Sequence, residues 1–296
     1  MAINQVKVTL NGTQHTLDYN STSGKWEKTI SAPTTTSYNL DGGYYPLSVS
    51  ATNTAGTTAT LDATEEPNLR LVVKEKIKPT IAIVSPSDGA YVANSSPTIK
   101  FTISDESGGS GVNPNSIVLK VDGNTVAVPT KTKSGNTYTC QASCNLSDGA
   151  HTIIIDASDN DGNTALSLSS TFTVDTVPPE LNISSPQNGY ITNDGTIVIV
   201  GSTNDITSTP VVVKVKVNGT DTGTVAVEDD GTFSKEVTIV EGSNTLVITA
   251  TDRAGKVTEI TLNVTLDTSV PEITNITITP NPVDSGATMT ISVEVS

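Results

Sequence analysis

Cysteine is nearly absent from this sequence of 296 residues, which contains only Cys140 and Cys144. A disulfide framework needs more cysteines at wider spacing. The segment around the pair alternates with period two, so both sulfurs are expected on the inward face of one strand, with Cα atoms about 13 Å apart. Because a disulfide requires Cα atoms within about 7 Å, we interpret the pair as two core thiols. A tight-turn bridge or a metal pair is the alternative.

Long apolar runs are missing as well. No stretch approaches the roughly 20 apolar residues that a membrane-spanning helix needs, so we expect no membrane insertion. The segment from Met1 to Leu10 alternates polar and apolar residues and shows neither the basic nor the apolar region of a secretory signal. We therefore expect either that a leader was removed or that the protein is made in the cytoplasm without the secretory route.

Basic residues are outnumbered, with 16 Lys and Arg against 31 Asp and Glu and a net charge of −15. An acidic surface repels phosphate, which argues against nucleic acid as a partner. It also argues against docking on anionic lipid. We interpret the acidity as a source of solubility.

Groups suited to catalysis are scarce. The two histidines, His15 and His151, lie in different predicted domains and offer no Ser/His/Asp or Cys/His site. The sequence has no Gly-rich phosphate loop and no His-Glu-x-x-His motif. Carboxylate pairs such as Asp105–Glu106 occur at predicted turns, outside the clefts where acid–base catalysis shifts pKa values. We predict a protein that is not an enzyme, with no catalytic and no cofactor-binding residue.

One acidic cluster has the residue types of a metal site. Asp159 and Asp161 lie at a predicted hairpin tip, and Asp175 lies at the following junction. Carboxylate oxygens at a domain junction are ligands that calcium accepts. The spacing lacks the glycine and terminal glutamate of an EF-hand, and aspartate also occurs at turns for backbone reasons. We expect no metal, and calcium at Asp159, Asp161 and Asp175 is the alternative, with the Gly-rich loop 105–111 as a similar case.

What the sequence does contain is a repeat. β-branched residues dominate, with Gly, Asn and Asp at turn positions, which is typical of strands and hairpins. A proline followed by alternating aliphatic residues begins at Pro79, at Pro179 and, in partial form, at Pro271. Two further landmarks recur: Asn/Asp-Gly turns at 11–12, 122–123 and 218–219, and a glycine followed by Trp26, Tyr138 or Phe233, each expected to fill a core.

Within one repeat the pattern predicts strands only. The second repeat contains seven: 80–84, 98–103, 116–121, 125–128, 138–146, 150–157 and 164–174. No segment shows a sustained helical period. Seven short strands in about 100 residues predict an all-β chain of tandem immunoglobulin-like antiparallel β-sandwiches. Short linkers that contain proline favour an elongated array.

Two phrases carry a resemblance to a known family. They are Val-Asp-Thr-Val-Pro-Pro at 174–179 and Ala-Thr-Asp-Arg-Ala-Gly at 250–255. The chain resembles the bacterial Ig-like domain superfamily over nearly its whole length. The resemblance implies this fold, and such domains serve in cell-surface adhesins, as spacers in secreted glycosidases and in phage particles. The segments 37–46 and 69–76 look most like Ig-like proteins of phage tail gene clusters.

The repeats are out of phase with the ends of the chain. We predict a partial domain at 1–76 that lacks its first two strands, whole domains at 77–177 and 178–269, and a two-strand fragment at 270–296. The fragment matches what the first segment lacks, so we expect the fragment of one chain to complete residues 1–76 of another by strand addition. The predicted interface residues are Ile276, Ile278, Met289, Ile291, Val293 and Val295.

These features favour a structural or display protein of a phage virion, associated with the tail and assembled head to tail. Its partners would be other copies, other virion proteins or a cell-surface glycan. The alternative is the stalk or adhesin segment of a secreted, extracellular or cell-surface bacterial protein. A third interpretation, a carbohydrate-binding accessory region, requires exposed aromatics. Tyr44 and Tyr45 are the only adjacent pair and the best candidates for surface contact.

Overall fold

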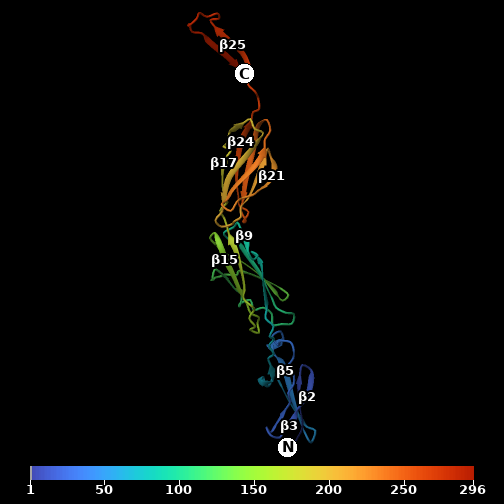
Figure 1. The fold of residues 1–296 in the computed structure, drawn as a ribbon. Helices are drawn as coiled ribbons and strands as arrows, with labels where there is room; N and C mark the ends of the chain where they lie inside the picture. The colour runs from blue at the N-terminus through green and yellow to red at the C-terminus, as the bar shows by residue number, and fades with distance from the viewer. Residues whose placement is uncertain (1) are drawn as a thin grey trace. The chain divides into compact units, whose positions relative to one another are not determined.

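The computed structural model describes residues 2–296, and these form strands, turns and two short 3-10 segments. The chain divides into two compact units, Met1–Asp175 and Thr176–Ser296. The first unit holds two sheet domains, drawn blue and teal to green in Figure 1, and the second holds one sandwich and a hairpin. Residues 2–296 include no helix long and apolar enough to cross a membrane.

The second sheet domain, at the end of the first unit, is a two-sheet sandwich. One sheet has the order β13-β14-β10-β8 and the other β12-β11-β15-β16-β9. The strands are β8 (Thr80–Ser85), β9 (Ala90–Val92), β10 (Thr98–Ser104), β11 (Val118–Val121), β12 (Asn124–Val126), β13 (Thr130–Ser134), β14 (Thr137–Ser143), β15 (Gly149–Asp156) and β16 (Leu168–Val174). All seven predicted strands are present. Two are additional. The side chains of β13 are all exposed and follow no apolar pattern, and β9 has only three residues, too few to show a period.

Alternation along each strand produces the core. In β10, Ile99, Phe101 and Ile103 are fully buried, and the residues between them are partly exposed. These side chains meet those of the opposite sheet in one apolar cluster. Cys140 is buried in β14 and Cys144 packs against the same cluster, and both thiols are free. The prediction of a core thiol is confirmed for Cys140, whereas Cys144 follows the end of β14 and is only partly buried.

The sandwich of the second unit repeats this plan. Its sheets have the orders β17-β19-β22 and β18-β24-β23-β20-β21. The strands are β17 (Glu180–Ser185), β18 (Tyr190–Thr192), β19 (Thr196–Asn204), β20 (Val212–Val217), β21 (Thr220–Val225), β22 (Thr232–Thr238), β23 (Gly242–Thr251) and β24 (Val257–Leu266). Asn218 and Gly219 both have positive φ, as a two-residue turn between β20 and β21 requires. Phe233 is buried in the core, as predicted.

The first sheet domain has one main sheet, with the order β2-β1-β5-β6. Its strands are β1 (Ile3–Leu10), β2 (Thr13–Thr16), β5 (Tyr45–Asn53), β6 (Thr58–Asp62) and β7 (Arg70–Leu71), which pairs with β5. A separate hairpin joins β3 (Asp18–Asn20) to β4 (Lys25–Glu27). Trp26 lies on that hairpin against Tyr19, with ring centroids 5.6 Å apart, and is only half-buried. The prediction that Trp26 fills a core is therefore wrong, because its ring packs on the two-stranded β3–β4 sheet against Tyr19, which is itself exposed.

The chain ends in an isolated hairpin of β25 (Ile273–Thr279) and β26 (Thr290–Val295). Directly opposite residues share a face, and the pairs Ile276–Val293 and Ile278–Ile291 place four aliphatic side chains together. Each of the six predicted interface residues is at least 41% exposed. The hairpin thus carries an apolar face that no other part of the described chain covers.

Candidate functional sites

Polar contacts join the two domains of the first unit. Asp161, in a loop of the second domain, accepts hydrogen bonds from the Thr36 hydroxyl (2.6 Å) and from the Glu75 amide (3.1 Å). The Lys74 ammonium donates to the Asp161 carbonyl at 3.2 Å, and Asn39 donates to the Gly109 carbonyl at 2.6 Å. Residues of the loop 36–39 therefore contact the second domain. So do Lys74 and Glu75 of the linker, the segment between β7 and β8.

Three carboxylates converge at this junction. Glu75, Asp105 and Glu106 each offer an oxygen, and these oxygens lie within 4.8 Å of one another. Asp105 and Glu106 follow β10, whereas Glu75 comes from the linker. Asp105 Oδ1 and Glu106 Oε2 are buried, and neither accepts a bond from an amide, amine or hydroxyl group. The sequence showed these two residues as an acidic pair at a turn, and the structure shows that the turn is covered.

The electrostatics of this cluster are unfavourable for three ionised groups. Burial raises the pKa of Glu106 to about 7, and a hydrogen bond with Asp105 and the negative charges of Asp105 and Glu75 act in the same direction. No Lys, Arg or His within residues 2–296 forms an ion pair with any of the three. Buried carboxylates without a compensating charge are costly, so the cluster favours either a proton or a bound cation.

The residues predicted as alternative calcium ligands have other partners. Both oxygens of Asp159 accept bonds within its own loop, from the Gly162 and Asn163 amides and from the Asn163 side chain. Asp161 Oδ2 is engaged at the domain junction. Asp175 is fully buried at the end of the first unit, where its amide donates to the Val92 carbonyl. The structure does not bring these three aspartates together as one site, and whether they bind calcium stays a prediction.

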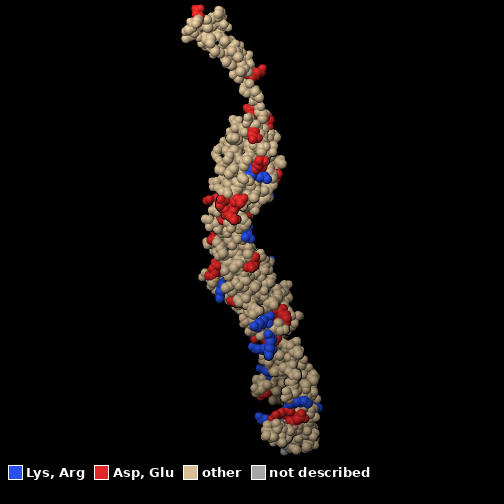
Figure 2. Space-filling model, viewed as in Figure 1, with Lys and Arg blue, Asp and Glu red and all other residues tan. Residues whose placement is uncertain are grey.

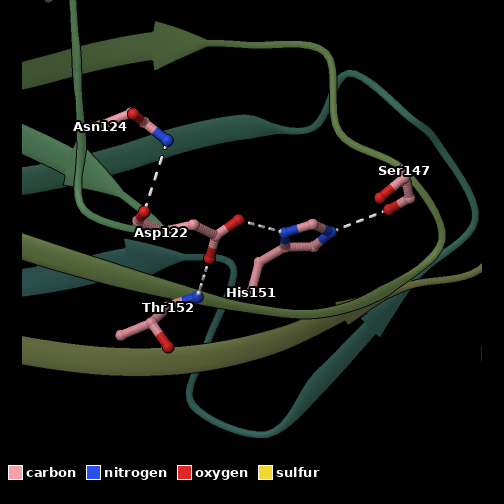
Figure 3. Close-up of polar contacts among 5 residues, drawn as sticks. All are labelled: Asp122, Asn124, Ser147, His151 and Thr152. Carbon is pink, nitrogen blue, oxygen red and sulfur yellow. Dashed lines mark hydrogen bonds and ion pairs between the residues drawn. The ribbon is translucent and has the colours of Figure 1, made fainter.

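A second polar site surrounds His151 on β15 (Figure 3). The imidazole Nδ1 lies 2.7 Å from Asp122 Oδ2, and Nε2 lies 2.8 Å from the Ser147 backbone carbonyl. The other oxygen of Asp122 accepts the Thr152 amide at 2.9 Å. His151 is 7% exposed and its ring lies 5.7 Å from that of Phe172. The imidazole thus fixes the Asp122 turn to β15 and to the loop before it.

Asp122, His151 and Ser147 are the residue types of a catalytic triad, but the geometry is wrong for one. Nε2 faces the carbonyl oxygen of Ser147 and not its hydroxyl, so it has no nucleophile to deprotonate (Figure 3). Both ring nitrogens face acceptors, which requires a proton on each. Burial lowers the pKa of His151, but the bonds to Asp122 and Ser147 outweigh burial and raise it above 6.5. A protonated imidazole is a structural clamp and not a general base.

The sandwich of the second unit has an uncharged version of this clamp. Asn218 occupies the turn position of Asp122, and Asn244 occupies the strand position of His151. Asn218 Nδ2 donates to Asn244 Oδ1 at 2.9 Å, and the Thr245 amide donates to Asn218 Oδ1 at 2.8 Å. Both sandwiches therefore have a hydrogen-bonded side-chain pair at this position, and only the pair in the second domain is charged.

The two tyrosines predicted to contact a ligand differ. Tyr45 is only 6% exposed and its hydroxyl lies 2.6 Å from the Thr35 hydroxyl. Tyr44 is half-buried, with the Arg70 guanidinium 5.2 Å from its ring centroid. Both line a surface cavity of about 460 Å³. The expectation of an exposed aromatic pair is wrong for Tyr45, because its ring is buried at the start of β5.

Acidic side chains are spread over both units on the face drawn in Figure 2, and basic side chains are fewer. This distribution agrees with the net charge of −15. That nucleic acid and anionic lipid are not partners stays a prediction from this charge.

Comparisons with known proteins identify two segments. Residues 78–176 match the sequence profile of a family described as a bacterial Ig-like domain. Residues 179–268 match the profile described as domain B of glucodextranase. Each match covers one sandwich, so the predicted fold of tandem immunoglobulin-like β-sandwiches is confirmed.

One curated relative is Bacillopeptidase F from Bacillus subtilis (strain 168), which is 32% identical over 176 residues. That match covers 60% of this chain and 11% of the relative, so the chain spans about a tenth of the relative's length. Among solved structures, the fibronectin(III)-like modules of Clostridium thermocellum CbhA are 17% identical, with a TM-score of 0.42 over 63% of this chain and 94% of theirs. Immunoglobulin domains 1–5 of Sidekick-1 are 13% identical, with a TM-score of 0.38 over 99% of this chain and 60% of theirs.

Proposed function

We propose that this chain is a non-enzymatic structural segment of an extracellular or cell-surface bacterial protein, where it spaces or presents other parts. The observation that carries the proposal is the His151 site. Residue types of a catalytic triad meet there, and the hydrogen bonds of His151 make the site a clamp. The bacterial family description and the relative from Bacillus subtilis favour this interpretation over a phage virion component.

The comparisons also support an accessory role. One profile is a named domain of glucodextranase, and the match to Bacillopeptidase F covers 11% of that protein. In both cases the matched part belongs to a protein with an enzyme's name. A spacer of this kind needs stable domains and fixed junctions more than it needs a cleft.

Hydrolase assays on purified residues 1–296 test the proposal. We expect no cleavage of peptide or α-glucan substrates by the wild-type chain or by a His151→Ala variant. Cleavage that the wild type shows and His151→Ala loses would contradict the proposal. Small-angle scattering adds a positive test, since the elongated array predicted from the repeats is what a spacer requires, and a compact particle would count against it.

We also propose that copies of this chain associate through the β25–β26 hairpin. In the second unit, Ile199 of β19 is fully buried, whereas the matching Ile291 of the hairpin is 57% exposed. In the first sheet domain, Val8 and Val49 are half-buried, whereas their counterparts in the other sandwich are fully buried. The apolar face of the β25–β26 hairpin has no partner, and the half-buried side chains of the first sheet domain have no sheet packed fully over them.

The free energy available is substantial. The six side chains are 41–59% exposed, so completing their burial contributes about half of the roughly 1.5–3 kcal/mol of a fully exposed side chain, or about 5–9 kcal/mol in total, before the entropy cost of association. Strand addition would also satisfy exposed backbone groups at the edge. Association through this face would therefore both bury the exposed apolar side chains of the hairpin and pair a strand edge.

Light scattering over a concentration series tests the association. We expect dimers or longer species for the wild type and monomers for Ile276→Lys/Ile291→Lys. Thr277→Lys is the matched control, since Thr277 lies between Ile276 and Ile278 and points to the other face of the hairpin. A wild-type chain that remains monomeric at all concentrations, or association that all variants retain, would refute the interface.

A further inference from the structure

The surface cavity of about 460 Å³ in the first sheet domain combines an aromatic ring with polar side chains. Three of its residues form one row across the sheet: Thr9 of β1 lies opposite Ser48 of β5, and Ser48 lies opposite Asp62 of β6. Directly opposite residues share a face of the sheet, so these side chains point to the same side. The row therefore brings two hydroxyl groups and one carboxylate to the cavity.

A cation and an aromatic ring lie beside this row. Arg70 of β7 lies opposite Pro46, which is two residues from Ser48 and shares its face. The Arg70 guanidinium lies 5.2 Å from the centroid of the Tyr44 ring, and Tyr44 lines the cavity. Arg70 Nε donates to the Ala63 carbonyl at 3.0 Å, which fixes the guanidinium. Its other N–H groups form no hydrogen bond with residues 2–296, so they are available to a ligand.

The charges at the cavity are not used by the fold. Neither Asp62 nor Arg70 forms an ion pair with any residue of the described chain. Hydrogen bonds from the hydroxyl and the amide of Thr64 hold the pKa of Asp62 below 3.8, so the carboxylate is ionised at neutral pH. The hydroxyls of Thr9 and Ser48 likewise make no hydrogen bond within residues 2–296.

The position of the Tyr44 ring is fixed before any ligand binds. A Cβ atom at Gly42 would lie 2.6 Å from Cε1 of this ring, and the φ of Gly42 is +74°, so the position requires glycine. The adjacent Tyr45 is buried, and its hydroxyl, 2.6 Å from that of Thr35, anchors the same segment. Tyr44 itself is only half-buried, so part of its ring remains accessible. Such preorganisation lowers the entropy cost of binding.

These groups define the chemistry of a ligand. One anion, Asp62, and one cation, Arg70, flank the cavity, so the site favours a ligand without net charge. A hydroxyl group both donates and accepts, so neighbouring hydroxyls of one ligand can bond to the carboxylate and to the guanidinium. An apolar face of C–H groups on the same ligand would pack against the Tyr44 ring. The cavity volume lies within the roughly 300–1,000 Å³ typical of small-molecule sites.

We propose that Tyr44, Asp62 and Arg70 bind a neutral saccharide, with the hydroxyls of Thr9 and Ser48 as further hydrogen-bonding partners. Sugar rings have both features that the cavity requires, an apolar C–H face and a rim of hydroxyl groups. The site is independent of association through the β25–β26 hairpin, because Val8 and Val49 are sequence neighbours of Thr9 and Ser48 and point to the other face of the sheet.

An array of neutral, sialylated and sulfated oligosaccharides, probed with the fluorescently labelled full chain, tests the ligand class. We expect binding to neutral oligosaccharides. Titration calorimetry with the neutral oligosaccharide that gives the strongest signal then tests the residues. Tyr44→Ala and Asp62→Asn should each bind it at least about tenfold more weakly, since they remove the ring contact and a charge-assisted hydrogen bond. Tyr44→Phe keeps the ring and should bind like the wild type.

Tyr19→Ala and Asp18→Asn are the matched controls, because both residues are exposed in the same domain and lie outside the cavity. Both should bind like the wild type. Thermal unfolding separates a lost contact from a damaged fold, and the exposed Asp62→Asn variant should unfold close to the wild-type temperature. Three results would overturn the proposal: no binding to any neutral oligosaccharide, binding to sialylated or sulfated ones alone, or equal binding by the wild type and the Tyr44→Ala/Asp62→Asn double variant.

Discussion

The charged His151–Asp122 clamp of the second domain can be replaced by substitution with the uncharged Asn218–Asn244 pair, which is found in the sandwich of the second unit. His151→Ala removes two hydrogen bonds and the ring contact with Phe172, and it leaves Asp122 without its imidazole donor. Hydrogen bonds that involve a charged group contribute about 1.5–3 kcal/mol. The Asp122 side chain is 42% exposed, and water screens its charge, so we expect a loss of about 2 kcal/mol.

The double variant Asp122→Asn/His151→Asn copies the Asn218–Asn244 pair and should restore part of the lost stability at neutral pH. Its pH dependence should differ from that of the wild type. The pKa of His151 is raised, so its contribution is complete below about 6.5 and is lost as the pH rises through the folded-state pKa. Burial raises the pKa of Asp122, but the bonds from His151 and Thr152 outweigh it, so the pKa lies below 3.8. The Asp122 contribution is present above that value and is lost as the pH falls through the lowered pKa.

The stability that the ion pair adds is therefore greatest between about pH 4 and pH 6.5. Differential scanning calorimetry at pH 5.5 and pH 8.5 measures this stability. The two pH values lie on either side of the pKa of a free histidine, roughly 6.5. The transition of the second domain is identified as the one that the double variant moves. We expect the wild type to exceed the double variant by more at the lower pH. A difference that does not change with pH, or that grows at the higher pH, would refute the clamp.

Three other substitutions test the packing and the junction. Gly201→Ala should destabilise the second unit by about 1–3 kcal/mol in chemical unfolding, because its Cβ would lie 2.6 Å from the Phe233 ring. Phe101→Ala should cost about 3–5 kcal/mol, since this fully buried ring would leave a cavity, and a loss below about 1 kcal/mol would contradict the core assignment. Asp161→Ala should speed proteolysis of the first linker, since it removes the acceptor of Thr36, and unchanged cleavage would show that the contact does not hold the junction.

The repeat made much of the fold predictable. Alternation with period two placed Ile99, Phe101 and Ile103 on the inward face, and the structure buries all three. The Asp122–Gly123 turn was predictable because a two-residue hairpin needs positive φ at both positions, which Asp and Gly tolerate. Edge strands such as β13 were missed, because their side chains are exposed on both faces and follow no apolar period.

The candidate sites were less predictable. Sequence spacing drew attention to Asp159 and Asp161, which stabilise a loop and a domain contact. The cluster of Glu75, Asp105 and Glu106 was not predicted as a unit, since Glu75 is about thirty residues away in the chain and meets the others only through the linker's path.

The sequence by itself determined the strand pattern, the turns and the repeated sandwich, because these follow from local backbone preferences and from alternation along one strand. Only the tertiary structure decided which polar groups meet. It paired His151 with a carbonyl oxygen instead of a hydroxyl, and it buried Asp105 beside two other carboxylates. Burial and charge compensation depend on neighbours that are distant in the chain, so no local pattern could determine them.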